Sequence, residues 1–185
     1  MNMDDKIDTV IDLEKVRLDK MARRAYRNWM SQLDEEFTYS TKLSSLSLKT
    51  LDILAEGKDK NSFYIYDLIM NLLGLGSGFQ FNELGAKDKI AVINQYLFLL
   101  DRFRFEYMKR LGWLESYPGE EITLVDLIIR FDLLAPGIQA TPPILSRGHP
   151  SFDKYQSLNT FEQEEFIRKL IPDLLKVISG QSKTL

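Results

Sequence analysis

The hydrophobic residues of this 185-residue chain recur at helical spacing through most of its length. The clearest run is residues 86–111, which contains neither Gly nor Pro and carries apolar residues through about seven turns. Residues 96–100 are apolar on every side, which is typical of a helix surrounded by other helices. We therefore predict a central, buried helix over residues 86–111.

The same spacing predicts about five further helices. Apolar residues recur at steps of three and four over residues 4–37, which predicts a long N-terminal helix. Two shorter helices are expected before the central one and two after it. We expect Pro172 to kink or restart the last of these, because proline lacks the amide hydrogen. No run alternates in the manner of a strand, so the sequence predicts a single all-α domain packed around residues 86–111.

Two segments interrupt this helical pattern. Residues 135–150 hold four prolines and two glycines, which predicts an irregular, Pro-rich arm. This arm carries Arg147 and the only histidine of the chain, His149. Residues 74–78 are rich in glycine, but a phosphate-binding loop follows a strand, whereas a predicted helix precedes this segment. We interpret residues 74–78 as a helix end followed by a turn.

Composition excludes several classes of chemistry. The chain has no cysteine, which excludes disulfides and Cys-ligated metals and favours a reducing compartment. A single histidine excludes paired Glu-x-x-His and His-Glu-x-x-His metal motifs, so no metal or cofactor is expected. No window is apolar enough to span a membrane, and we expect a cytoplasmic protein. The only embedded carboxylates available for acid–base work are Asp67, Asp101, Asp126 and Asp132.

Four cations are spaced along one side of the predicted N-terminal helix. Arg17, Lys20, Arg24 and Arg27 follow one another at steps of three, four and three residues, and we call them the basic stripe. One interpretation is a contact for phosphate groups or for an acidic partner. The other is an ordinary solvated face that neighbouring acidic residues such as Glu14 partly neutralise. The net charge of −3 argues against a protein devoted to neutralising phosphates.

Phe98 and Phe105 break the polar side of the predicted central helix, which also carries Gln95 and Arg102. Two phenylalanines in a polar face need an apolar partner. That partner is a second layer of the same chain, another subunit or a bound peptide, and we favour the same chain. Which of these applies is left open by the sequence.

Charged residues of the central helix are spaced for pairing with one another. Arg104 falls among apolar positions, and its nearest carboxylate is Asp101, one turn earlier. Glu106 has Arg102 and Arg110 four residues away on either side. We expect a structural ion-pair network here rather than an anion-binding site.

No motif in the chain identifies a reaction. We therefore expect a non-enzymatic protein-interaction domain, self-association included, that uses the first helix and the arm at 135–150. One alternative is a nucleic-acid-associated protein that binds through the basic stripe. The second is an enzyme with a pocket at the 135–150 arm. The candidate contact residues are Arg17, Lys20, Arg24, Arg27, Phe98, Phe105, Arg147 and His149.

Overall fold

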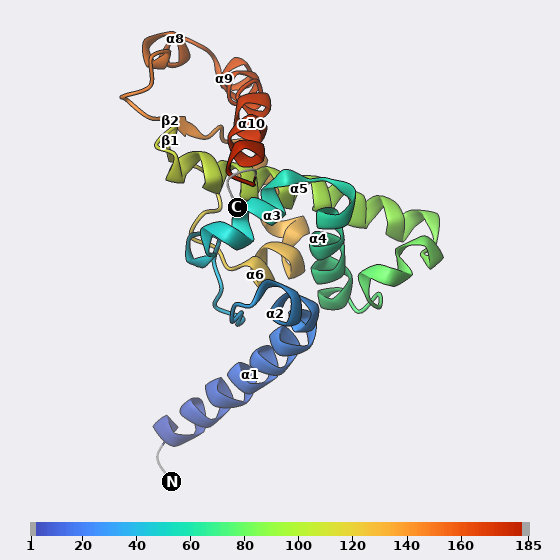
Figure 1. Ribbon diagram of the computed structural model, residues 1–185. Helices are drawn as coiled ribbons and strands as arrows, with labels where there is room; N and C mark the ends of the chain where they lie inside the picture. The colour runs from blue at the N-terminus through green and yellow to red at the C-terminus, as the bar shows by residue number, and fades with distance from the viewer. Residues whose placement is uncertain (1–2, 183–185) are drawn as a thin grey trace.

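The computed structural model describes residues 3–182, with side chains at 13–58 and 60–180. This part of the chain is all-α, as predicted, with one two-stranded sheet (Figure 1). The elements are α1 (Met3–Ala25), α2 (Arg27–Leu33), the 3-10 helix η1 (Leu43–Ser45), α3 (Leu48–Glu56), α4 (Asp59–Leu72), the 3-10 helix η2 (Gly78–Glu83), α5 (Ala86–Arg110), β1 (Leu114–Ser116), α6 (Leu124–Ile129), α7 (Phe131–Gln139), β2 (Ile144–Leu145), α8 (Phe152–Gln156), α9 (Thr160–Arg168) and α10 (Ile171–Ser182).

Helix α5 is the central element. It packs against α3, α4, α10, η1 and β1, and Figure 1 shows it crossing the whole body of the molecule. Val92, Phe103 and Tyr107 on α5 are fully buried. The prediction of a central helix over residues 86–111 is confirmed.

The buried side of α5 is rotated from the predicted one. Ile93 and Leu97, predicted for the core, are exposed, whereas Gln95 and Arg102, predicted for the solvent face, are buried. The reason is tertiary: α7 and the turn that follows β1 contact the side that the sequence assigns to solvent. The periodicity of the helix was right, but the face that other elements cover is set by segments far along the chain.

The N-terminal helix is shorter than predicted and is divided in two. Helix α1 ends at Ala25, and α2 ends at Leu33, because Asp34 adopts a left-handed conformation with φ of 50°. The predicted single helix over residues 4–37 is therefore wrong beyond Leu33. Phe37 lies past the helix end and folds back, so that its ring stacks on that of Tyr26 with centroids 5.2 Å apart.

The Pro-rich arm is more regular than predicted. Helix α7 runs through Pro136 to Gln139; the bond that proline cannot make would go to Asp132, which is exposed to water. The buried residues Ala135 and Ile138 hold this helix on the body. Residues 144–145 then form β2, which pairs with β1 in antiparallel register. The prediction that the chain has no strand was wrong.

Two other predicted breaks are confirmed. Gly74 and Gly76 have positive φ, and the segment after α4 is a turn, not a phosphate loop. Gly78 closes that turn against α4 by donating its backbone N–H to the Asp67 carboxylate at 2.8 Å. The last predicted helix restarts near Pro172, which lies in the first turn of α10, where its missing amide hydrogen costs little.

Candidate functional site

Helix α1 leaves the body of the molecule, so that only its last turns pack on other elements (Figure 1). Among its described side chains, Ala22 and Ala25 are the buried ones. The helix contacts α4 at this end. We call α1 the N-terminal arm, fixed at its C-terminal end and projecting at the other.

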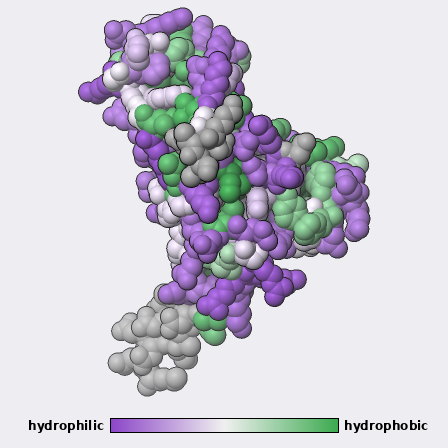
Figure 2. All heavy atoms as spheres, viewed as in Figure 1, coloured by the Kyte–Doolittle hydropathy of each residue, from purple (hydrophilic) through white to green (hydrophobic). Residues whose placement is uncertain are grey.

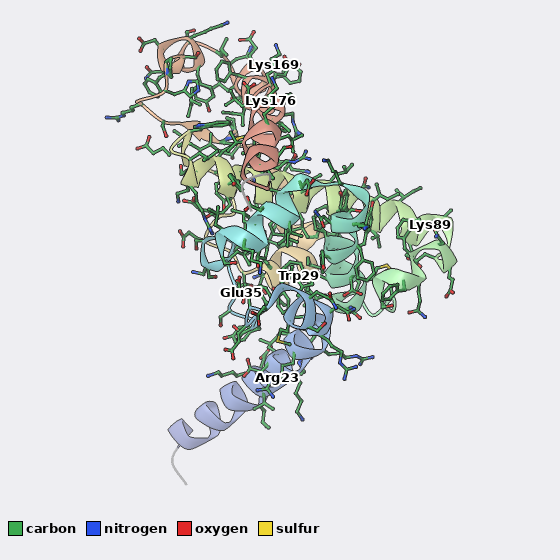
Figure 3. All side chains as sticks on the ribbon, in the orientation of Figure 1. Arg23, Trp29, Glu35, Lys89, Lys169 and Lys176 are labelled. Atoms are coloured by element: carbon green, nitrogen blue, oxygen red, sulfur yellow. The ribbon has the colours of Figure 1, made fainter. Side chains whose placement is uncertain are left out.

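Helix α2 fixes the arm to the body through buried contacts. The indole N–H of Trp29 donates to the backbone oxygen of Tyr64 at 2.8 Å. The side-chain amide of Asn28 donates to the carboxylate of the fully buried Asp67 at 2.9 Å. Trp29 lies inside the body in Figure 3, whereas Arg23, less than two turns earlier, lies on the arm. The base of the arm is therefore a structured part of the core.

The arm exposes two aliphatic side chains. Leu13 is 66% exposed and Val16 is 49% exposed. Figure 2 shows a small hydrophobic patch beside hydrophilic residues on the described part of α1. Sequence reasoning missed both residues, because they lie outside the apolar series at 7, 11, 18 and 21. A rotation of about 100° per residue places Leu13 and Val16 on the same side of the helix as the basic stripe. This shared side is the sequence signal that could have identified both residues as exposed.

All four cations of the basic stripe are exposed. Three of them lie on the arm, and Arg27 is the first residue of α2 at its base. Arg17 approaches Glu14 at 3.8 Å, with both side chains largely in water. An exposed pair of this kind contributes about 1 kcal/mol at most. In the described part of the chain, Lys20, Arg24 and Arg27 form no ion pair. The stripe therefore continues the apolar pair Leu13 and Val16 as one exposed surface on the arm.

Phe98 and Phe105 are covered by the chain itself. Their side chains are buried, and their rings contact Phe131 and Tyr117 with centroid distances of 5.3 and 6.2 Å. The guanidinium of Arg102 lies between the two rings, 5.1 and 4.8 Å from their centroids, and donates to the Pro118 oxygen at 2.7 Å. Burial lowers the pKa of Arg102 to about 10. The two phenylalanines are core residues and present no surface to a partner in this conformation.

Arg104 does not pair with Asp101, contrary to the expectation. It donates to the backbone oxygens of Ala55 and Glu56 at 2.9 and 3.3 Å, the last carbonyls of α3. Asp101 instead pairs with Arg168 of α9 at 2.8 Å. Both arginines border a surface pocket of about 650 Å³ between α5, α7 and α9. Because their hydrogen bonds are directed to protein acceptors, the pocket does not form an anion site.

Glu106 is the centre of a buried polar cluster. It accepts from Arg110 at 3.0 Å, as the sequence predicts, and from the hydroxyl of Tyr117 at 2.6 Å. The expected pair with Arg102 is not formed, since Arg102 turns toward Pro118. Burial, and then the hydrogen bond to Glu106, raise the pKa of Tyr117. The cluster joins the end of α5 to the turn after β1 and is fully explained as structure.

The two candidate residues of the Pro-rich arm do not converge on one site. His149 borders a pocket of about 330 Å³ together with Trp113 and Asp173, while Arg147 is exposed and not part of its lining. The Nδ1 atom of His149 accepts from the Ser151 backbone at 3.1 Å. Asp173 is exposed, so none of the described residues that line the pocket is a buried carboxylate able to orient the imidazole. The geometry therefore does not favour an enzyme at this position.

The described residues hold no group of three or more side chains suited to a metal ion. Within the same part of the chain, no helix combines the length and the apolar character needed to cross a membrane. Comparison of the chain with protein-family models, curated proteins and solved structures finds no match.

Proposed function

We propose that this chain is a protein-interaction domain whose contact element is the N-terminal arm. The observation that carries the proposal is the exposure of Leu13 and Val16 on a helix that projects from the body. A helix with an apolar contact and a charged border resembles the elements that dock into grooves or onto other helices.

Simple energetics support this use of the arm. Burying an aliphatic side chain such as Leu or Val stabilises a contact by about 1.5 to 3 kcal/mol. The cations of the basic stripe add charge complementarity, which speeds encounter with an acidic partner and selects against basic ones. Because α2 holds the base of the arm on the body, this part of the helix is already ordered before binding. Binding therefore loses less conformational entropy there.

Site-specific photo-crosslinking in the source cell tests the proposal. A photoreactive amino acid at Val16 should give adducts of the chain with another polypeptide. The matched control is the same amino acid at Lys169, an exposed residue on the opposite part of the molecule (Figure 3). Absence of any Val16-specific adduct would contradict the proposal.

A second candidate function rests on the basic stripe. Four exposed cations in one line suit contacts to a nucleic-acid backbone. Binding of this kind should weaken steeply with salt, and the change of Arg24 and Arg27 to Glu should abolish it. Wild-type chain that binds neither DNA nor RNA at low salt would end this alternative.

A further inference from the structure

Charge is distributed unequally along α1. Residues 4–12 contain four aspartates and one lysine, whereas residues 14–25 contain five cations and two acidic residues. Leu13 lies between these two segments and Val16 lies just inside the second, so the exposed pair is near the middle of the helix. The helix dipole favours acidic residues in the first turn and basic ones in the last, but it gives no reason for two exposed aliphatic residues at the centre.

We propose that the N-terminal arm pairs with the arm of a second copy in antiparallel orientation. This inference rests on the proposed function and names the partner. In an antiparallel pair, the acidic segment of each chain runs alongside the basic segment of the other, and Leu13 and Val16 of both copies meet at the two-fold axis. Such a contact is self-complementary, as a two-fold dimer requires.

A parallel pair of arms is less favourable and would arrange the two bodies differently. It sets cation against cation along the basic stripe, which destabilises a helix pair. It also places both bodies at the same end, because each body is attached to the C-terminal end of its arm (Figure 1). In the antiparallel pair the bodies stand at opposite ends, separated by the length of a 23-residue helix, which is about 34 Å.

Exchange of charge tests the pairing on the full chain. One variant carries R17E, K20E and R24E, and the other carries D5K and D12K, the acidic positions that helical spacing places nearest the side of Leu13 and Val16. Sedimentation should show a concentration-dependent dimer for the wild type and a dimer about tenfold or more weaker for each variant alone. An equimolar mixture of the two variants should restore a mixed dimer, because the acidic arm of one then faces the basic arm of the other.

A distance measurement tests the orientation. The chain has no cysteine, so R23C alone accepts a single spin label. Position 23 lies nine residues from the helix centre, so an antiparallel pair separates the two labelled backbones by about 27 Å. A parallel pair would separate them by about 10 Å. The short distance would overturn the proposal.

Two further outcomes would also contradict the proposed pairing. A wild type that stays monomeric at millimolar concentration overturns the pairing, as does a dimer that both charge variants retain. Photo-crosslinking at Val16 separates this failure from that of the proposed function. Adducts with a different protein, from a chain that is monomeric, would sustain the interaction domain and exclude the second copy as its partner.

Discussion

The buried hydroxyl group of Tyr26 lowers the free energy of unfolding. Its side chain is fully buried among aromatic rings, and within the described residues its hydroxyl has no hydrogen-bond partner. Desolvation raises the pKa of Tyr26. An unpaired buried hydroxyl destabilises a fold by about 1 to 3 kcal/mol. Tyr26 is therefore a residue at which a smaller side chain should be tolerated.

The change Tyr26→Phe is expected to leave the free energy of unfolding near pH 7 unchanged or to raise it by about 1 kcal/mol. Above about pH 10, the unfolded tyrosine loses its proton while the folded one keeps it, so wild-type stability falls as pH rises. The variant should lose less stability over that interval. Urea unfolding at neutral and alkaline pH, with Tyr39→Phe as control, measures both effects. A variant that is less stable than the wild type near pH 7 would contradict the expectation.

Gly78 is held so closely to α4 that a side chain does not fit. A Cβ atom there would lie 2.8 Å from the Phe63 ring and 3.0 Å from the backbone of Asp67. Gly137, within α7, has nothing within 4 Å of the same position. The two residues therefore form a matched pair for substitution.

Gly78→Ala should destabilise the fold by about 1 to 3 kcal/mol, because the turn must move and weaken its bond to Asp67. Gly137→Ala should stabilise it by about 0.5 to 1 kcal/mol, since alanine favours the helix. Thermal unfolding of both variants checks the two signs. Equal effects at the two positions would show that the close approach at Gly78 is unimportant.

At the scale of elements, helix ends are satisfied by side chains from distant parts of the chain. The clearest case is α3, whose last carbonyls accept hydrogen bonds from Arg104 of α5. A cation at this end also favours the negative end of the helix dipole. Arg104 thus attaches the end of α3 to the central helix.

Arg104→Met keeps the apolar stem of the side chain and removes both hydrogen bonds. We expect a loss of about 1 to 2 kcal/mol in the free energy of unfolding, since the α3 carbonyls lose their donors. Arg147→Met is the control, because Arg147 is exposed. Urea unfolding compares the two. Equal stability of the Arg104 variant and the wild type would refute the capping role.

At the scale of the whole molecule, the body and the N-terminal arm differ in what holds them. The body has one continuous core, which includes Trp29 of α2 and Phe103 of α5. Before Met21, which is partly buried against that core, the arm contributes no described residue to it. Stability and the proposed interaction therefore belong to different parts of the chain.

Removal of residues 1–16 should change the free energy of unfolding by no more than about 0.5 kcal/mol when measured at low protein concentration. Low concentration matters because a dimer through the arm would add stability by mass action. Fluorescence of the two tryptophans, Trp29 and Trp113, during urea unfolding gives the measurement, because both pack in or against the core. A loss of several kcal/mol would show that the arm is part of the folding unit.

Local sequence signals placed some helix ends correctly and others not. From the sequence alone, Gly57 and Gly112 are predicted to end α3 and the central helix, and Thr123 is predicted to cap the helix that begins at Leu124. The structure confirms all three, with positive φ at both glycines.

The sequence predicts Ser44 or Ser45 as the cap of α3 and Thr160 as the cap of the last helix. In the structure Ser47 caps α3, two or three positions later, and Asn159 caps α9, one position earlier. Several polar residues adjoin each helix start, and the final choice depends on how the entering chain is held.

The candidate site was predicted in part. The spacing of the basic stripe follows from the helix period alone, and the structure shows its four residues exposed. Leu13 and Val16 were missed, because an exposed aliphatic residue is identified only when the elements that fail to cover it are known. Arg147 and His149 were paired on sequence proximity, whereas the fold places only His149 at a pocket.

The sequence by itself determined that the chain is all-α, that residues 86–111 form the central helix, and that α1 carries charge of opposite sign at its two ends. These properties depend on periodicity and composition within a few turns. Only the tertiary structure decided which side of α5 is buried, where β1 meets β2, and that α1 projects. Those outcomes depend on contacts between segments far apart in the chain, whose free energies outweigh local preference.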